Sequence, residues 1–352
     1  MRHHWLAALV VLSGCGGGSS DSSTPPSCSR AELGKTLIQQ ATDLSVDTDF
    51  TLLVERISDG ASVSVARNSS SAVTRYESAS TSKWVTAVVI LRLVEQGKLS
   101  LDDKPSRWIA EWPLAADHPL SAMTLRQLLS FTSGLVDEPL CQNSPIADFA
   151  NCVVTGVQQN ANSGRTPGSV FHYNSLHLQV AGLMAVRAAG VANWTALFRQ
   201  FQQSTGLFGT SSYDLPSASN PRLAGGMHWT GQEYLDFLRA LAKGQLLGAS
   251  LQAQLLANQR GNATVLYSPA LAGFGVDWPY GLGNWQECSG STCTASRYSS
   301  PGAYGAYPVL DLGKGYIAMY ARQGALGTFV LGKTQVDALT PAINAWASCN
   351  NR

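Results

Sequence analysis

Charged residues are scarce in this chain. Only 13% of the 352 residues are Asp, Glu, Lys or Arg, which is about half the usual share. The formal net charge is +1. This balance provides no basic face for a nucleic acid and no strong field for an acidic polymer, so neither is expected as a partner. Apolar residues make up 45% of the chain, as expected for a globular protein with a large core.

Several catalytic and metal-binding signatures are also missing. The sequence contains no Gly-x-Ser-x-Gly, which argues against the nucleophile elbow of an α/β-hydrolase. Neither Cys-x-x-Cys nor His-Glu-x-x-His spacing occurs, so a zinc site has little support and no cofactor is expected. After the N-terminus, no apolar run is long enough to span a bilayer.

The N-terminus has the features of an export signal. A short polar start precedes the apolar run Trp5–Leu12, and the run leads into Leu-Ser-Gly-Cys15, which resembles the lipobox of bacterial lipoproteins. The resemblance implies a signal peptide over residues 1–14 and a lipid on Cys15. Cleavage of a simple secretory signal near Gly14–Gly18 is the alternative. Both interpretations predict an exported protein, either secreted or held in the cell envelope by the lipid alone, in the outer membrane of a Gram-negative source. Residues 15–29 would be a flexible tether.

The cysteines fit an oxidising compartment. With Cys15 set aside, six of the seven remain, an even number that predicts disulfides in an exported protein. Six cysteines allow many pairings, so the sequence alone leaves the connectivity open. We favour Cys141–Cys152 and Cys288–Cys293, because each pair closes a short local loop. This choice leaves Cys28–Cys349 to join the two ends of the chain.

The hydrophobic pattern predicts strands near both ends of the chain and helices between them. Helices are expected over residues 31–44, 80–95, 125–130, 176–189, 194–205, 232–242, 250–258 and 334–347. Strands are expected over 50–57, 61–67, 298–307 and 316–322, the first two as a hairpin. The early strands must therefore pair with the late ones.

The sharpest chemical signal is Ser80-Thr81-Ser82-Lys83 at the start of an apolar helix. A spacing of three places Lys83 on the same helix face as Ser80, and the helix N-terminus directs N–H groups and positive dipole toward it. A lysine in apolar surroundings loses part of its preference for the charged form. It can then accept the Ser80 proton or hold the base that does. The spacing alone is common by chance, so its context decides.

That context resembles the class C β-lactamase-like superfamily of serine hydrolases. This group includes class C β-lactamases, D-alanyl-D-alanine carboxypeptidases, family VIII carboxylesterases and nylon-oligomer hydrolases. The resemblance is carried, in order, by Ala79–Trp84 with the following helix and Gly97–Asp103, by Met123–Leu135, by Pro167–Ser175, by Ala224–Met227 and by Tyr280–Gly283. The segment Met123–Leu135 is similar to the family's T-L-R-x-L-L-x-H-T-S-G-L, with Phe131 where His is usual. Together the matches span roughly Phe50 to Arg322.

The resemblance implies an α+β fold of the β-lactamase/transpeptidase type. Three layers, α-β-α, would contain an antiparallel sheet built from N- and C-terminal segments and flanked by helices. Residues 30–98 and 220–352 would form this α/β region, and residues 99–219 a mainly helical region inserted in it. A monomer is expected.

The resemblance also assigns catalytic roles. Ser80 would be the nucleophile that forms an acyl-enzyme, with Lys83 as its partner. Tyr173 would be the second catalytic motif, because a Tyr beside a Lys can share its proton and act as general base toward Ser80. The family pattern there is Tyr-x-Asn. In this sequence Ser175 stands third and Asn174 is shifted by one, so Ser175 would offer the substrate a shorter hydroxyl.

The third family motif is Lys- or His-x-Gly on an inner strand, and Ser300-Pro301-Gly302 matches it best. Gly302 suits a strand where a ligand passes close to the backbone. The resemblance implies that the N–H of Ala303 joins that of Ser80 as the oxyanion hole. Penicillin-recognising members carry a cationic or polarisable residue at the place of Ser300, which helps to hold the substrate carboxylate. A serine supplies no charge.

The charge could come from Arg322, at the end of the next strand, unless this is a solvated strand-end residue. Aromatic residues around the third motif, Tyr304 among them, could form an apolar acyl site. We therefore expect a carboxylesterase acting on neutral esters, polyester oligomers included. The alternative within the fold is a β-lactamase, D-Ala peptidase or linear-amide hydrolase. The alternative of another class is a non-catalytic envelope lipoprotein that binds a ligand, and the retained catalytic residues argue against it.

Overall fold

The protein was analysed as a computed structural model that describes residues 28–288 and 293–350. The expected signal peptide, Cys15 and the tether up to residue 27 lie outside the described residues.

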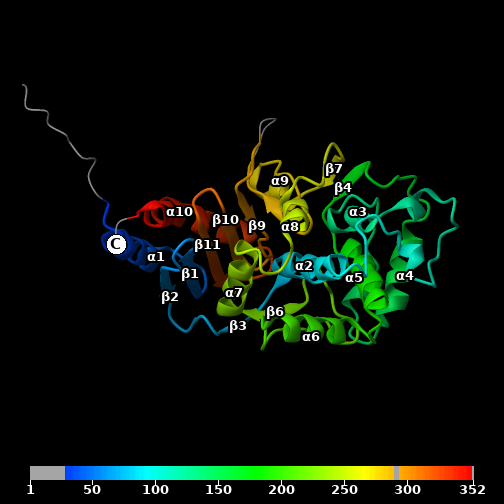
Figure 1. The fold of residues 1–352 in the computed structure, drawn as a ribbon, viewed down its shortest axis with the longest axis horizontal. Helices are drawn as coiled ribbons and strands as arrows, with labels where there is room; N and C mark the ends of the chain where they lie inside the picture. The colour runs from blue at the N-terminus through cyan, green and yellow to red at the C-terminus, as the bar shows by residue number, and fades with distance from the viewer. Residues whose placement is uncertain (1–27, 289–292, 351–352) are drawn as a thin grey trace, which may run out of the picture.

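A six-stranded sheet forms the centre of the α/β part, in the order β2-β1-β11-β10-β9-β8 (Figure 1). Its strands are β1 (Phe50–Arg56), β2 (Ser62–Ala66), β8 (Trp285–Gln286), β9 (Arg297–Ser299), β10 (Tyr307–Asp311) and β11 (Tyr316–Arg322). All neighbours are antiparallel, and β1 lies between β2 and β11 with Phe50 opposite Arg322. The first strands therefore pair with the last, and the predicted fold class is confirmed.

Alternate residues of the sheet face two separate hydrophobic cores. On β11, Tyr316 and Tyr320 belong to one core, and Ile317 and Met319 to the other. The first core is closed by α1 (Arg30–Asp43) and α10 (Phe329–Ser348). The second is closed by α2 (Ser82–Glu95) and α7 (Gly231–Ala242). The result is the three-layer arrangement of helix, sheet and helix.

The remaining helices extend the second core away from the sheet. They are α3 (Leu125–Leu129), α4 (Phe149–Gln159), α5 (Leu176–Ala189), α6 (Trp194–Thr205), α8 (Ala249–Leu256) and α9 (Pro269–Phe274). Helices α3, α4 and α5 gather in the right-hand part of Figure 1, and α6 lies along its lower edge. Local signals set their limits: Asn193 accepts a hydrogen bond from the Ala196 N–H to cap α6, and Gly190, with φ 66°, ends α5.

Within the described ranges, two small sheets and four 3₁₀ turns connect these elements. The three-stranded sheet has the order β3 (Arg75–Glu77), β6 (Met227–Thr230) and β5 (Ser212–Tyr213), and β4 (Val170–His172) pairs with β7 (Thr264–Tyr267). The turns are η1 (Ala79–Thr81), η2 (Pro105–Arg107), η3 (Pro119–Ala122) and η4 (Leu140–Asn143). No single helix among the described residues is long and apolar enough to cross a membrane; only α5 and α6 taken together, bent by 70°, reach that length and composition.

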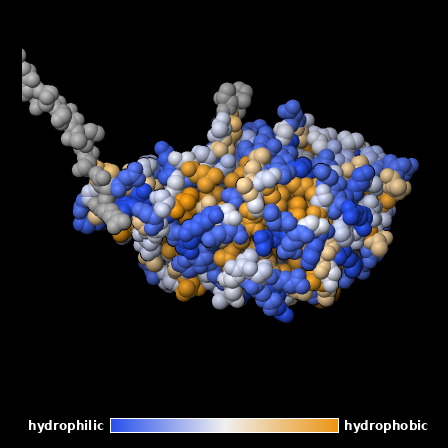
Figure 2. Space-filling model, in the orientation of Figure 1, coloured by the Kyte–Doolittle hydropathy of each residue, from blue (hydrophilic) through white to orange (hydrophobic). Residues whose placement is uncertain are grey.

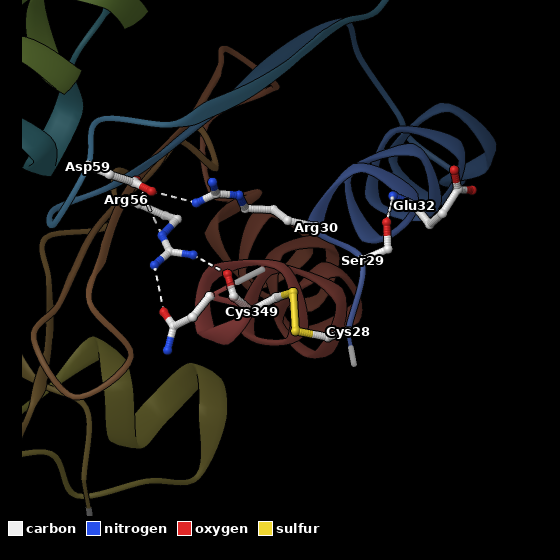
Figure 3. The surroundings of a disulfide bond; sticks show 8 residues. Cys28, Ser29, Arg30, Glu32, Arg56, Asp59 and Cys349 are labelled. Atoms are coloured by element: carbon white, nitrogen blue, oxygen red, sulfur yellow. Dashed lines mark hydrogen bonds and ion pairs between the residues drawn. A yellow bond between two sulfur atoms is a disulfide. The ribbon is translucent and has the colours of Figure 1, made fainter. Parts of the chain in front are cut away.

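The structure contains the three disulfides Cys28–Cys349, Cys141–Cys152 and Cys288–Cys293. Figure 3 shows the first, which joins the start of α1 to the end of α10. Beside it, the Arg56 guanidinium donates to the Cys349 carbonyl, and Arg30 forms an ion pair with Asp59. The two chain ends are thus fixed to each other and to the β1–β2 hairpin.

Two predicted elements differ from those observed at the candidate active site, and in addition α10 begins at Phe329, five residues before the predicted start of the last helix. The strand expected over 298–307 is two strands, β9 and β10, separated by a loop over residues 300–306. The helix expected from Ser80 begins with η1, and α2 starts only at Ser82. Both differences lie at the candidate active site, where the backbone departs from regular geometry.

Candidate active site

Ser80 lies in a tight turn between β3 and α2. The preceding residue, Ala79, has φ 43°, a left-handed conformation that residues with a Cβ rarely adopt. Two hydrogen bonds between Ser78 and Met227 hold the turn: the Ser78 N–H donates to the Met227 carbonyl at 2.8 Å, and the Ser78 hydroxyl accepts from the Met227 N–H at 3.1 Å. The neighbouring strand β6 therefore fixes a strained turn that presents the Ser80 hydroxyl.

Lys83 lies directly beneath this hydroxyl. Its Nζ is 2.8 Å from Ser80 Oγ and donates to the Ala224 carbonyl, also at 2.8 Å. The side chain is only 4% exposed. Burial lowers the pKa of Lys83 from 10.5 to about 7; the Glu138 carboxylate opposes this shift and the Arg222 guanidinium adds to it. A large share of Lys83 is therefore neutral near pH 7 and able to accept the Ser80 proton.

Tyr173 completes the cluster from the end of β4. Lys83 Nζ lies 4.6 Å from the centre of the Tyr173 ring, and the ring stacks on Trp285 at 5.4 Å with 20° between the planes. Burial raises the pKa of Tyr173 far above its ordinary value, although hydrogen bonding with Ser80 and Trp285 lowers it in part. Tyr173 thus keeps its proton at neutral pH. This favours Lys83 as the base and Tyr173 as a proton donor.

A cluster of buried aromatic side chains packs against Tyr173. Phe131 is fully buried, and its ring centre lies 5.3 Å from Tyr173, 5.1 Å from His177 and 4.9 Å from Tyr280. Burial lowers the pKa of His177 to about 3. The two ring nitrogens of His177 contact the Ser133 hydroxyl and the His172 carbonyl, at 2.8 and 2.9 Å. His177 is therefore a neutral structural residue, and the side chains that pack beneath Tyr173 carry no charge.

The third predicted motif packs against the nucleophile turn. The Ser300 hydroxyl donates to the Ser80 carbonyl at 3.0 Å, and Ser300 is only 2% exposed. A Cβ on Gly302 would lie 2.7 Å from the Ser78 carbonyl oxygen, so only glycine allows this approach. The turn closes through bonds from the Gly302 N–H to Ala306 and from the Gly305 N–H to Gly302. It brings Ala303 to the same cleft as Ser80.

The cleft above Ser80 is a cavity of about 190 Å³. Its lining comes from segments far apart in the sequence: Ser80, Tyr173, Tyr267, Pro269, Phe274, Trp285, Pro301, Ala303 and Phe329. None of these side chains carries a formal charge. Such walls suit an uncharged, apolar group of a substrate. Elsewhere, among the residues that the structure describes, no cluster of His, Cys, Asp and Glu could hold a metal ion.

Arg322 does not reach this cleft, and its expected role in substrate binding is wrong. Its side chain is fully buried and forms a two-pronged ion pair with Asp47, at 2.7 and 2.8 Å. It also donates to Gln335 at 2.6 Å. A Cβ on Gly305 would lie 2.8 Å from Arg322 Nε, so the guanidinium lies behind the Gly302–Ala306 turn. The ion pair with Asp47 links strand β11 of the sheet to the segment that follows α1.

Ser175 and Tyr304, also predicted to contact the substrate, are not among the residues that line the cleft, and neither is the shifted amide of Asn174. The Ser175 N–H donates to the Glu138 carboxylate at the start of α5. The Asn174 amide donates to the Leu135 and Val136 carbonyls, at 3.1 and 3.0 Å. Tyr304 is half-buried and contacts Glu77. The Asn174 amide is therefore engaged with the protein's own backbone.

Sequence reasoning missed part of the cleft wall. Tyr267, Pro269, Phe274 and Phe329 come from β7, α9 and the first turn of α10. The available signal was composition: residues 261–276 contain no charged residue and no histidine, although they include a turn and a short helix. Glu138 and Arg222, which act on the pKa of Lys83 in opposite directions, belong to no motif that marks them in the sequence.

Comparisons with known proteins agree with this geometry. A sequence model of the family described as Beta-lactamase matches residues 57–338. Among curated proteins, Protein flp of Staphylococcus aureus (strain NCTC 8325 / PS 47) is 27% identical over 120 residues, which cover 32% of this chain and only 23% of flp. Esterase EstB of Burkholderia gladioli is 41% identical over 63 residues, 18% of this chain and 16% of EstB.

Among solved structures, the putative beta-lactamase from Bacteroides dorei DSM 17855 superposes with a TM-score of 0.72 at 26% identity. The superposition covers 90% of this chain and 99% of that one. The likeness therefore extends over nearly the whole fold.

Proposed function

Because the chain belongs to the beta-lactamase family and has the serine-hydrolase fold of that family, we propose that it is a carboxylesterase that forms an acyl-enzyme on Ser80. The substrates are neutral esters, polyester oligomers included. The observation that carries the proposal is the cleft: none of the side chains that line it is charged. The name Esterase EstB, carried by a protein that is 41% identical to this chain over 63 residues, also supports an esterase.

The candidate anion-binding positions also favour neutral substrates. Ser300 has no charge, and its hydroxyl already donates to the Ser80 carbonyl. Arg322 is paired with Asp47. A desolvated, charge-assisted bond contributes about 1.5–3 kcal/mol, and neither residue is placed to offer one to a substrate carboxylate. Anionic β-lactams and D-Ala-terminal peptides should therefore bind weakly.

The geometry supports a sequence of balanced proton transfers. Neutral Lys83 accepts the Ser80 proton as Oγ attacks the ester carbonyl. The N–H groups of Ser80 and Ala303 stabilise the oxyanion, each by about 3 kcal/mol. Tyr173 donates its proton to the departing alkoxide and recovers one from protonated Lys83. In the second half, water attacks the acyl-enzyme and gives one proton to the same pair, which passes it to Ser80 Oγ as the bond from the acyl carbon to Oγ breaks and the acid departs.

Export is part of this proposal. Three disulfides support an oxidising compartment, and the lipobox-like Cys15 would anchor the protein to the cell envelope by a lipid. Incorporation of radiolabelled palmitate into the full-length protein, lost in Cys15→Ala, is the expected result. Release of an unlabelled protein would favour the simple secretory signal.

The first test is enzymatic. The mature protein from Ser27 onward is assayed with p-nitrophenyl butyrate and with a chromogenic cephalosporin, beside a Ser80→Ala control. We expect ester turnover that disappears in the control, with little cephalosporin turnover. Strong cephalosporin turnover would make the protein a β-lactamase instead. Failure to react with esters, with the cephalosporin and with acyl phosphonates would favour a non-catalytic binding protein.

A further inference from the structure

Two uncharged segments form the outer wall of the cleft. The first is residues 261–276, which include β7 and α9, and the second is residues 323–332, which lead into α10. Neither contains Asp, Glu, Lys, Arg or His. From the first, Tyr267, Pro269 and Phe274 line the cleft; from the second, Phe329 does.

The same segments expose large hydrophobic side chains to solvent. We call these six residues the collar: Leu266, Tyr267, Leu271, Leu326, Val330 and Leu331. Leu326 is 76% exposed, and the others are between 38% and 46% exposed. The described residues include eleven exposed large hydrophobics, and six of them belong to these two segments. Exposed apolar residues scattered singly are ordinary, whereas a cluster beside a binding cleft marks a contact surface.

The two halves of the collar adjoin each other. The rings of Phe274 and Phe329 lie 5.5 Å apart, and a Cβ on Gly273 would lie 2.5 Å from Phe329 and 3.3 Å from Val330. Helix α9 therefore packs directly on the start of α10. Figure 2 shows hydrophobic residues gathered across the middle of the face that presents α9. The collar is continuous with the cleft at whose base Ser80 lies.

We propose that the collar docks the enzyme on the surface of a water-insoluble ester, a droplet or film, from which single chains enter the cleft. The inference rests on the proposed esterase function and names its substrate class. A neutral, apolar liquid matches a surface on which no charged group has to be desolvated. An anionic lipid surface would call for a basic rim around the apolar residues. The cations that flank the two segments do not supply one, because each is already paired with a carboxylate: Arg260 with Asp277, Arg322 with Asp47 and Lys333 with Asp337.

Binding is tested apart from catalysis, in the Ser80→Ala background. The protein is mixed with trioctanoin droplets and centrifuged, and the fraction that floats is measured. The collar variant Leu271→Ser/Leu326→Ser is compared with a matched variant, Val73→Ser/Leu312→Ser, whose exposed apolar residues lie in turns outside both segments. We expect the parent and the matched variant to float, and the collar variant to lose at least ten-fold in bound fraction. Thermal unfolding of all three should coincide.

Activity is then measured with Ser80 intact. The collar variant should hydrolyse soluble p-nitrophenyl butyrate at the parent rate and emulsified trioctanoin at least ten-fold more slowly. A parent that stays in the aqueous phase, a collar variant that floats like the parent, or binding to phosphatidylcholine vesicles without binding to droplets would overturn the inference. If soluble ester is hydrolysed but droplets are not bound, only the collar fails. If soluble ester is not hydrolysed, the proposed function fails as well.

Discussion

Arg322 and Lys83 are both buried basic residues, and the groups that they contact give them different roles. Arg322 is fully buried beside Asp47, so its charge is compensated and serves the structure. Lys83 is equally buried, but its hydrogen bonds go to two neutral oxygens, of Ser80 and Ala224. Because the Glu138 carboxylate offsets the cost of burying the ammonium only in part, burial lowers the pKa of Lys83 to about 7. Arg322 therefore stabilises the fold through its ion pair, whereas Lys83 can accept and release a proton near neutral pH.

The lowered pKa of Lys83 predicts a pH dependence. The neutral amine is the active form, so kcat/KM for p-nitrophenyl butyrate should rise with pH through about 7 and then level off. At pH 5 the rate should be about 100-fold below the plateau, because that pH lies about two units below the pKa. A pH-stat series from pH 5 to 9 measures this. Since Glu138 raises the pKa of Lys83, Glu138→Gln should shift the inflection to lower pH; a flat profile would contradict Lys83 as the base.

Replacing Arg322 separates its structural role from the substrate contact first expected. Arg322→Met leaves Asp47 without its cation, but the Asp47 side chain is 33% exposed and water can solvate it, so the loss of stability should be about 1–2 kcal/mol. KM for p-nitrophenyl butyrate should change by less than about two-fold. Chemical denaturation and steady-state kinetics measure the two effects. Asp47→Asn serves as control and should cost more, about 3 kcal/mol, because it leaves the fully buried guanidinium without a counter-charge. A selective rise in KM for anionic substrates in Arg322→Met would restore Arg322 to the site.

At the scale of elements, the sequence predicts regular segments well and the site loops poorly. Helices α5 and α6 begin and end where their apolar spacing and terminal glycines indicate. The turn at Ala79 and the loop over residues 300–306 interrupt their elements because tertiary contacts hold them. Ser300 donates to Ser80, and Ser78 bonds to Met227, more than a hundred residues away. No local pattern contains those partners.

The packing of the Gly302 turn on the nucleophile turn yields a test. Gly302→Ala would place a methyl group 2.7 Å from the Ser78 carbonyl oxygen and 3.1 Å from Thr81, so the Ser80 turn must shift. We expect kcat to fall about 100-fold, with a stability loss of only about 1–3 kcal/mol. Kinetics and thermal unfolding report these separately. Gly209→Ala is the control, since nothing lies within 4 Å of its added methyl group; equal effects of both changes would refute the packing argument.

At the scale of the whole molecule, the catalytic cluster depends on closure of the chain. Ser80 follows the first strands, whereas Ala303 and Phe329 lie beside the last ones. The sheet brings them together by pairing β1 with β11 over its full length, from Phe50–Arg322 to Arg56–Tyr316. Sequence reasoning could place Ser80, Lys83 and Tyr173 from ordered motifs. The cleft wall from α9 and α10 could not be placed, because it exists only after this closure.

The Cys28–Cys349 disulfide should stabilise that closure without touching catalysis. It links residues 321 positions apart, and a loop of that length corresponds to roughly 4–6 kcal/mol of unfolded-state entropy. It lies at the far end of α10, which has 20 residues and so spans about 30 Å from Phe329 at the cleft. Cys28→Ser/Cys349→Ser should therefore lower Tm markedly and leave kcat at 25 °C unchanged. Calorimetry and an ester assay on the same sample measure both.

Cys141→Ser/Cys152→Ser is the matched control. The loop that this disulfide closes spans 11 positions, so removing the disulfide should cost about 3 kcal/mol. Equal losses of stability in the two double variants would contradict the view that the terminal disulfide acts by closing the long loop between the chain ends.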